Sequence, residues 1–69
     1  MAITVSHTYN TTVDITYYAE KDLYVNCSDT GTMDDIAERV IDVLVKHNFS
    51  YADVCSAYTG EVLMIIKRT

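Results

Sequence analysis

Few residues of this chain have the type and spacing that chemistry requires. Its two cysteines, Cys27 and Cys55, and its two histidines, His7 and His47, could in number form a four-ligand zinc site. The spacing argues against such a site, because no CxxC or HxxxH pair brings two ligands together on one element. Buried, reduced cysteines and structural histidines are the simpler interpretation, with His47 partly buried near the end of a helix. We therefore expect no metal and no cofactor.

Catalytic motifs are equally scarce in the sequence. It contains no glycine-rich phosphate loop, no nucleophile elbow and no acid–base pair at a recognisable spacing. A hypothesis of enzymatic activity therefore has no set of residues to support it, and we expect a protein that is not an enzyme.

The most distinctive spacing belongs to acidic residues. In the segment TMDDIAERVIDVLVKHN, which runs from Thr32 to Asn48, Asp34, Glu38 and Asp42 recur every four residues. At helical spacing they form one row of like charge, and each neighbouring pair costs a few tenths of a kcal/mol. The dipole of the first helical turn compensates Asp34 but fades before the other two carboxylates. This cost indicates that the row is used to bind a partner.

Ordinary surface features flank this row. Asp35 and Arg39, and likewise Asp42 and Lys46, are spaced to form ion pairs with the acid first, the favourable orientation. Val45 lies beside the row, and we expect this apolar side chain to be exposed. The candidate partner-binding residues are Asp34, Glu38, Asp42, Asp35, Asp29 and Val45.

The charge of the whole chain limits what the partner can be. Ten acidic residues against five basic ones give a net charge of −5 over 69 residues. Binding of nucleic acid through its phosphates depends on Lys and Arg, so we expect no direct contact with DNA or RNA. A protein with a basic surface is the natural partner, although such a charge also keeps a small domain soluble.

Length and hydropathy predict the class of protein. At 69 residues the chain has room for a single compact domain, which spans residues 1–69. No apolar run approaches the roughly 20 residues that a membrane span needs. The first residues also lack the basic and apolar regions of a signal peptide. We expect a cytoplasmic protein with no membrane contact.

A helix is predicted to carry the acidic row. Thr32 precedes it, with Asp35 three residues later in a variant of the capping box, and Asn48 is suited to the left-handed conformation that ends a helix. One broad side of this helix is apolar and can lie across a sheet. The residues on that side are Met33, Ile36, Ala37, Val40, Ile41, Val43, Leu44 and His47.

Strands are predicted on both sides of the helix. Residues 2–9, 12–18 and 23–27 alternate between apolar and polar side chains, as half-buried strands do. The simplest arrangement of these segments is an antiparallel meander. Residues 28–32, SDTGT, then read as a turn before the helix.

The C-terminal part predicts a hairpin. Residues 51–68 read as two strands joined by a tight turn at Thr59 and Gly60. Residues 62–66, VLMII, are apolar on both faces and therefore indicate a central strand. The predicted fold is α+β with the order βββαββ, a single antiparallel sheet of four to five strands with one helix packed across one face.

One helix leaves the other face of the sheet open. If Val62, Met64 and Ile66 face the helix, then the open face carries an apolar and aromatic patch. Its principal members are Tyr18, Tyr24, Leu63 and Ile65, joined by Cys55 and Ala57. Such a patch can form a homodimer contact, which makes a self-assembling, small-ligand-binding or structural module the alternative function. Tyrosines also lie on strands by propensity alone.

The acidic row beside apolar side chains in a small single-sheet protein resembles small phage-encoded inhibitors, such as anti-CRISPR proteins and DNA-mimicking inhibitors. The resemblance covers size, acidity and the layout of sheet and helix over all 69 residues, without a shared motif. It implies a protein that occupies the basic, nucleic-acid-binding surface of a host protein in the host cytoplasm.

Overall fold

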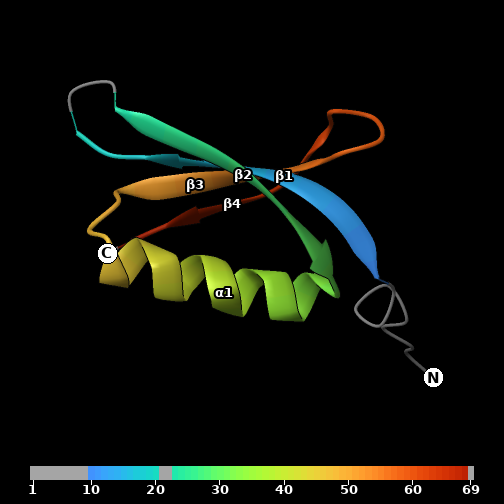
Figure 1. Cartoon of the computed structure of the whole chain (residues 1–69), viewed down its shortest axis with the longest axis horizontal. Coiled ribbons are helices and arrows are strands. Elements are labelled where there is room, and N and C mark those ends of the chain that lie inside the picture. Colours follow the sequence, from blue (N-terminus) through green and yellow to red (C-terminus); the bar gives the residue numbers. More distant parts are fainter. Residues whose placement is uncertain (1–9, 21–22, 69) are drawn as a thin grey trace.

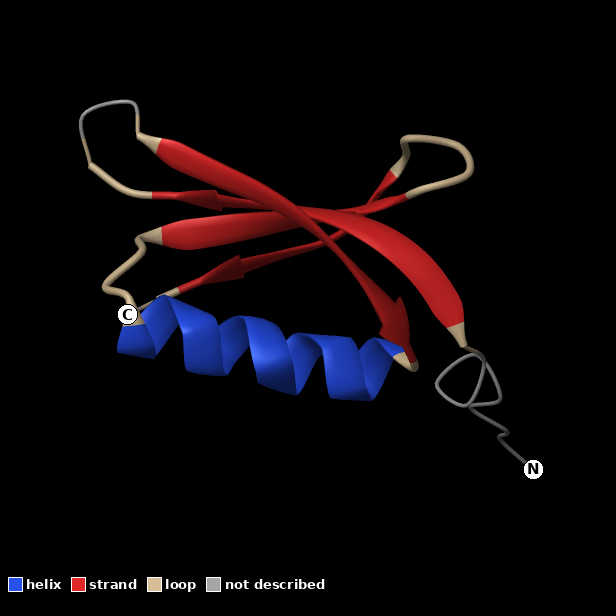
Figure 2. Cartoon of the chain, viewed as in Figure 1, coloured by secondary structure: helices blue, strands red, loops and turns tan. Residues whose placement is uncertain are grey.

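The computed structural model describes residues 10–20 and 23–68. Over these residues the chain forms an antiparallel sheet of four strands and one helix, with the sheet order β2-β1-β3-β4. In chain order the elements are β1 (Thr11–Tyr18), β2 (Tyr24–Gly31), α1 (Met33–Lys46), β3 (Tyr51–Ser56) and β4 (Val62–Lys67). The helix lies along one side of the sheet (Figure 1; Figure 2). The predicted class, α+β with a single antiparallel sheet, is confirmed; the predicted strand at residues 2–9 and its His7 lie outside the described residues.

The core forms between α1 and the two inner strands. Ile36, Val40 and Leu44 from the helix are buried, and they belong to one cluster with alternate residues of β1 and β3. The strand residues of this cluster are Val13, Ile15, Tyr17, Ala52 and Val54. Burying several aliphatic side chains contributes about 1.5–3 kcal/mol each, which makes this cluster the main source of stability.

The ends of the helix follow the sequence signals. The Thr32 hydroxyl accepts a hydrogen bond from the Asp35 backbone N–H at 3.2 Å, which satisfies one free donor of the first turn. The helix ends at Lys46, one residue before His47, and Asn48 has a φ of 58°. The left-handed Asn predicted at this end is confirmed, as is the turn at Gly60, which has a φ of 77°.

β2 is longer than its sequence predicts. The expected turn at residues 28–32 is wrong, because Ser28 to Gly31 continue the strand and pair with Thr11 to Asp14 of β1. Polar side chains support this extension: the hydroxyls of Thr12 and Thr30 lie 3.1 Å apart, in hydrogen-bonding contact across the strands. Cross-strand pairing therefore overrides the turn propensity of Ser, Asp, Thr and Gly.

β4 has a different place in the sheet from the one predicted. Among the described strands it lies at an edge, beside β3, where a central strand was expected at residues 62–66. Met64 and Ile66 do pack against the core, as expected. Val62 does not join them, because a bulge between Val54 and Cys55 shifts the register and places Val62 opposite Cys55.

Candidate partner-binding surfaces

The acidic ridge, defined as Asp34, Glu38 and Asp42, lies on the exposed side of α1. All three residues belong to the helix and are exposed, as is Asp35 in the first turn. They share the side turned away from the core residues Ile36 and Val40. The fold therefore presents the carboxylates of α1 to solvent as the helical spacing predicts.

Asp29 does not belong with that ridge. Its carboxylate accepts a hydrogen bond from Arg39 Nε at 2.8 Å, and Arg39 Nη2 donates to the Thr30 carbonyl at 3.2 Å. Gly31 leaves room for this contact, since a Cβ there would lie 2.8 Å from Arg39 Nη2. The predicted pairing of Arg39 with Asp35 is wrong, because the guanidinium turns toward β2 instead. Asp29 is thus a structural residue that ties β2 to α1.

The charge of Asp29 is stabilised by these contacts. The hydrogen bond from Arg39 lowers the pKa of the Asp29 carboxyl, desolvation opposes the shift, and the Thr30 backbone N–H at 2.8 Å lowers it further. Asp29 is therefore ionised at neutral pH with its charge matched by Arg39. A partner that used Asp29 would have to displace that guanidinium.

Apolar side chains lie beside the acidic ridge. Val45 is 64% exposed, as expected, and Ile41 is 50% exposed, although its place in the apolar pattern predicts burial. Together with Glu38 and Asp42 they line a shallow hollow on the helix. The Lys46 ammonium lies 3.8 Å from Asp42, so this predicted ion pair is confirmed, with both side chains largely exposed. The helix surface thus combines carboxylates with accessible apolar area.

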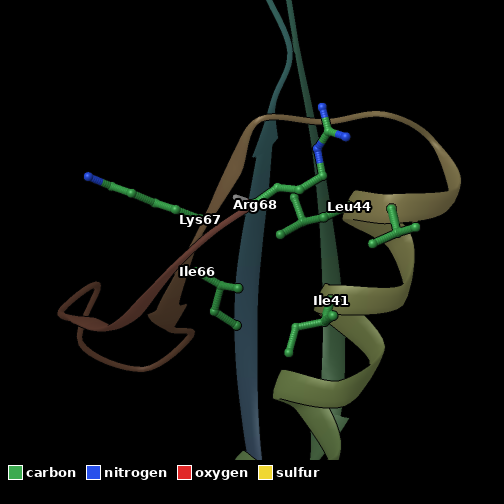
Figure 3. Close-up of a pocket in the computed structure, with 6 residues that line it drawn as sticks. Ile41, Leu44, Ile66, Lys67 and Arg68 are labelled. Carbon is green, nitrogen blue, oxygen red and sulfur yellow. The ribbon is translucent and has the colours of Figure 1, made fainter.

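A second apolar depression separates α1 from β4. It has a volume of about 290 Å³ and is lined by Ile41, Leu44, Val45, Ile66, Lys67 and Arg68. In Figure 3, Ile41 and Ile66 extend into the space between the helix and the strand, whereas Lys67 points away from it. We call this depression the α1–β4 groove. It leaves part of the helix's apolar side uncovered.

The open face of the sheet carries a row of tyrosines. Tyr24, Tyr18 and Tyr51 lie opposite one another on β2, β1 and β3. Ring centroids are 6.4 Å apart for Tyr24 and Tyr18 and 4.5 Å apart for Tyr18 and Tyr51, the latter stacked. Desolvation and the nearby Asp53 carboxylate raise the pKa of Tyr18. We call these three residues the aromatic row.

Apolar residues of β4 extend this patch. Ile65 lies opposite Asp53 and Val62 opposite Cys55 on this face, and both are exposed. Leu63 is also exposed, but it lies at the bulge and has no residue opposite it on β3. Tyr51, which sequence reasoning missed, completes the row, and its position could have been found from the alternation of β3. Ala57 lies in the turn after β3 and not on a strand.

The other half of the open face is polar. Asn26 donates a hydrogen bond to the Thr16 hydroxyl at 2.9 Å, and Ser28 donates to Asp14 at 3.4 Å. Each of these hydrogen bonds joins a side chain of β2 to one of β1. The open face is therefore divided into a polar end and an aromatic end.

The cysteines and His47 are placed differently from what was expected. Cys27 is exposed and Cys55 is half-buried, so the prediction of two buried thiols is wrong. Cys27 pairs with Ile15 on the helix side of the sheet and Cys55 with Asp14 on the open side, so they cannot form a disulfide. Desolvation and Asp29 raise the pKa of Cys27, which disfavours a reactive thiolate.

His47 caps the helix as an exposed residue, where partial burial was predicted. Its ring lies 6.2 Å from that of Phe49, and Phe49 stacks on Tyr17 at 5.3 Å. Within residues 10–20 and 23–68, no group of three or more His, Cys, Asp or Glu side chains is placed to hold a metal ion.

Comparisons with known proteins returned no match: no family model, no curated protein and no solved structure is significantly similar to this chain. Among the described residues, no helix is both long and apolar enough to cross a membrane.

Proposed function

We propose that this chain is a small, non-enzymatic protein-binding module that docks the outer side of α1 on a basic surface of another protein. The observation that carries the proposal is the composition of that side: exposed carboxylates of the acidic ridge lie next to the exposed Ile41 and Val45. Carboxylates steer a basic partner toward the helix, and apolar side chains supply contact area that excludes water.

The proposed partner is a nucleic-acid-binding protein in the cytoplasm of the cell in which this chain acts. Its basic groove is adapted to the closely spaced phosphates of DNA or RNA. An acidic helix bearing Asp34, Glu38 and Asp42 presents one carboxylate about every 6 Å over about two turns, a line of negative charge that such a groove can accept. The chain would then inhibit its partner by occupying that groove, as the phage-encoded inhibitors that it resembles do.

The core lies on the side of α1 turned away from Glu38 and Asp42. Ile36, Val40 and Leu44 hold the helix to the sheet, and Arg39 fixes its edge to β2. Substituting Glu38 and Asp42 therefore leaves the packing of this core unchanged. A binding surface of this kind can be altered without loss of the fold.

The experiment is a capture from a lysate of the native cell, followed by elution with duplex DNA. The bait proteins are the wild type, Glu38→Lys/Asp42→Lys, and the matched control Asp14→Lys/Glu20→Lys. Both variants have the same net charge, but the control changes acids outside α1. We expect the wild type and the control to retain a protein that duplex DNA releases, and the ridge variant to lose it.

Two results would contradict the proposal. Equal capture by the ridge variant would remove the helix from the binding surface, and equal loss in both variants would show that net charge alone is responsible. Circular dichroism of all three proteins checks that the fold is retained.

A second function, self-assembly through the open face, is favoured by the aromatic row. Tyr24 is 66% exposed and can offer its ring to another molecule. Replacing Tyr24 with Ser should then lower the molecular mass measured by light scattering after size exclusion. An unchanged mass would contradict this function.

A further inference from the structure

A half-buried carboxylate lies among aromatic and apolar side chains on the open face of the sheet. Asp53 belongs to β3, and Ile65 of β4 lies opposite it. Tyr51 precedes it by two residues and is therefore on the same face, with Tyr18 of β1 opposite Tyr51. Three neighbouring strands thus place two tyrosines and one isoleucine beside a single carboxylate. We call Tyr18, Tyr51, Asp53 and Ile65 the Asp53 corner.

No ion pair within the described part of the chain neutralises Asp53. The ion pairs formed there involve Asp29 and Asp42. Lys67 shares the open face, where it lies opposite Tyr51, and it takes part in neither of these pairs. A half-buried carboxylate has lost part of its hydration, and here no opposite charge compensates that loss. A cation supplied by another molecule is therefore favoured at Asp53.

The two rings of the corner have a defined arrangement. Tyr18 and Tyr51 are stacked, with ring centroids 4.5 Å apart and planes 14° apart. Because Tyr18 covers the β1 side of the Tyr51 ring, the other face of that ring is turned toward β4. Tyr51 is 36% exposed and Ile65 is 55% exposed. A ring face and an aliphatic side chain are therefore accessible next to the carboxylate.

The Tyr18 hydroxyl lies near enough to Asp53 to respond to its charge. Desolvation is the main cause of the raised pKa of Tyr18, and the Asp53 carboxylate adds to it through its charge and a hydrogen bond. The phenol is therefore protonated at neutral pH and can donate to the carboxylate. Since an ionised carboxylate accepts several hydrogen bonds, Asp53 can still accept from a second donor.

We propose that the Asp53 corner binds an arginine side chain of another protein. The guanidinium donates to the Asp53 carboxylate and lies on the β4-facing side of the Tyr51 ring, while its methylene stem covers Ile65. Arginine fits better than lysine, because its planar fork can bond a carboxylate at two positions and stack on an aromatic ring. The corner is on the face of the sheet opposite α1, so the inference does not rest on the function proposed for the acidic ridge.

Nuclear magnetic resonance of the full chain, titrated with the capped peptide acetyl-Gly-Arg-Gly-amide, tests the site. We expect saturable shifts of the backbone amides of Asp53 and Ile65. Asp53→Asn should weaken binding by about tenfold or more, because a hydrogen bond to a charged group is lost. The matched control Asp14→Asn removes the same charge from the exposed part of the open face and should bind as the wild type does. Dispersed spectra check that both variants are folded.

Three results of this titration would overturn the inference. Equal weakening in Asp14→Asn would show that net charge alone attracts the peptide. Equal shifts with a peptide that has neutral citrulline in place of arginine would show that the carboxylate is not used. Shifts at Glu38 and Asp42 without shifts at Asp53 would assign the arginine to the acidic ridge.

Ring variants and a second peptide test the stacked geometry. Tyr51→Leu should weaken binding of the arginine peptide about two- to fivefold, the contribution of an exposed cation–π contact. Tyr24→Ser, on the far strand β2, should leave the affinity unchanged. The peptide acetyl-Gly-Lys-Gly-amide should bind more weakly than the arginine peptide. Equal binding of the lysine peptide, or equal loss in Tyr24→Ser, would overturn the proposed contact with Tyr51.

Self-assembly through the aromatic row would cover the same residues and is tested on the same samples. Light scattering after size exclusion should give the 7.8 kDa mass of one chain under the conditions of the titration. A dimer that shows no peptide-induced shift at Asp53 would overturn the inference and favour self-assembly instead.

Discussion

The carboxylates of β2 and those of α1 belong to one acidic region of the sequence but have different roles in the fold. Asp29 on β2 is held by Arg39 and the Thr30 N–H, with a lowered pKa. Glu38 and Asp42 on α1 are exposed on the side away from the core. The difference shows that a carboxylate's role depends on which element faces it. Asp29 stabilises the structure, whereas Glu38 and Asp42 are exposed to solvent.

The largest effect is expected from a substitution in the core that holds α1 against the sheet. Leu44 is fully buried in the core cluster, and Leu44→Ala should lower the free energy of unfolding by about 2–5 kcal/mol. Urea denaturation at neutral pH measures this change. If Leu44→Ala cost less than breaking the bond between Asp29 and Arg39, the polar contact and not the core would position the helix.

A double-mutant cycle sharpens the role of Asp29. Asp29→Asn and Arg39→Met should each destabilise the fold slightly, and the double variant should cost less than their sum because the pair is lost only once. Thermal or urea denaturation gives all four values. Strict additivity would mean that the 2.8 Å contact contributes nothing as a pair.

The pH dependence of stability should separate the two kinds of carboxylate. Because the pKa of Asp29 is lower in the folded chain than in the unfolded one, its ionised form stabilises the fold above the unfolded value of about 4. This contribution is lost as the pH falls through the folded value. Asp29→Asn should therefore lose less stability than the wild type between neutral and acidic pH in urea titrations. Identical acid profiles would contradict the assignment.

The smallest effect is expected on the acidic ridge itself. Glu38→Gln removes like-charge repulsion with the residues four positions before and after it, and should stabilise the fold by about 0.2–0.5 kcal/mol. The measurement is the urea midpoint at low salt, where screening is weakest. Destabilisation by Glu38→Gln would show that this carboxylate has a structural role, which would remove the contrast with Asp29.

Much of the fold follows from local patterns in the sequence. The helix from Met33, its Thr32 cap and the left-handed Asn48 could be predicted because caps and apolar periodicity act within a few residues. The extension of β2 through Ser28 could not, because it depends on pairing with β1, which is remote in sequence. The position of β4 at the edge of the described strands was not predicted for the same reason: sheet order depends on long-range pairing, which residue pattern alone does not determine.

The candidate site was predictable in part. Helical spacing places Asp34, Glu38 and Asp42 on one side because a helix fixes its own geometry. The same local rule assigned Arg39 to Asp35 and failed, since the guanidinium is long enough to reach Asp29 on β2. A long, flexible side chain can pair with residues of several elements. Which pair forms depends on the tertiary structure and cannot be predicted from local spacing.

The affinity of the captured partner for three purified proteins tests the central claim most directly. We expect the wild type and Asp29→Asn to bind with similar dissociation constants in isothermal titration calorimetry. Glu38→Lys/Asp42→Lys should bind at least about 100-fold more weakly, the loss expected when attractive charge pairs become repulsive. Weakening by Asp29→Asn equal to that of the ridge variant, or unchanged binding by the ridge variant, would contradict the account.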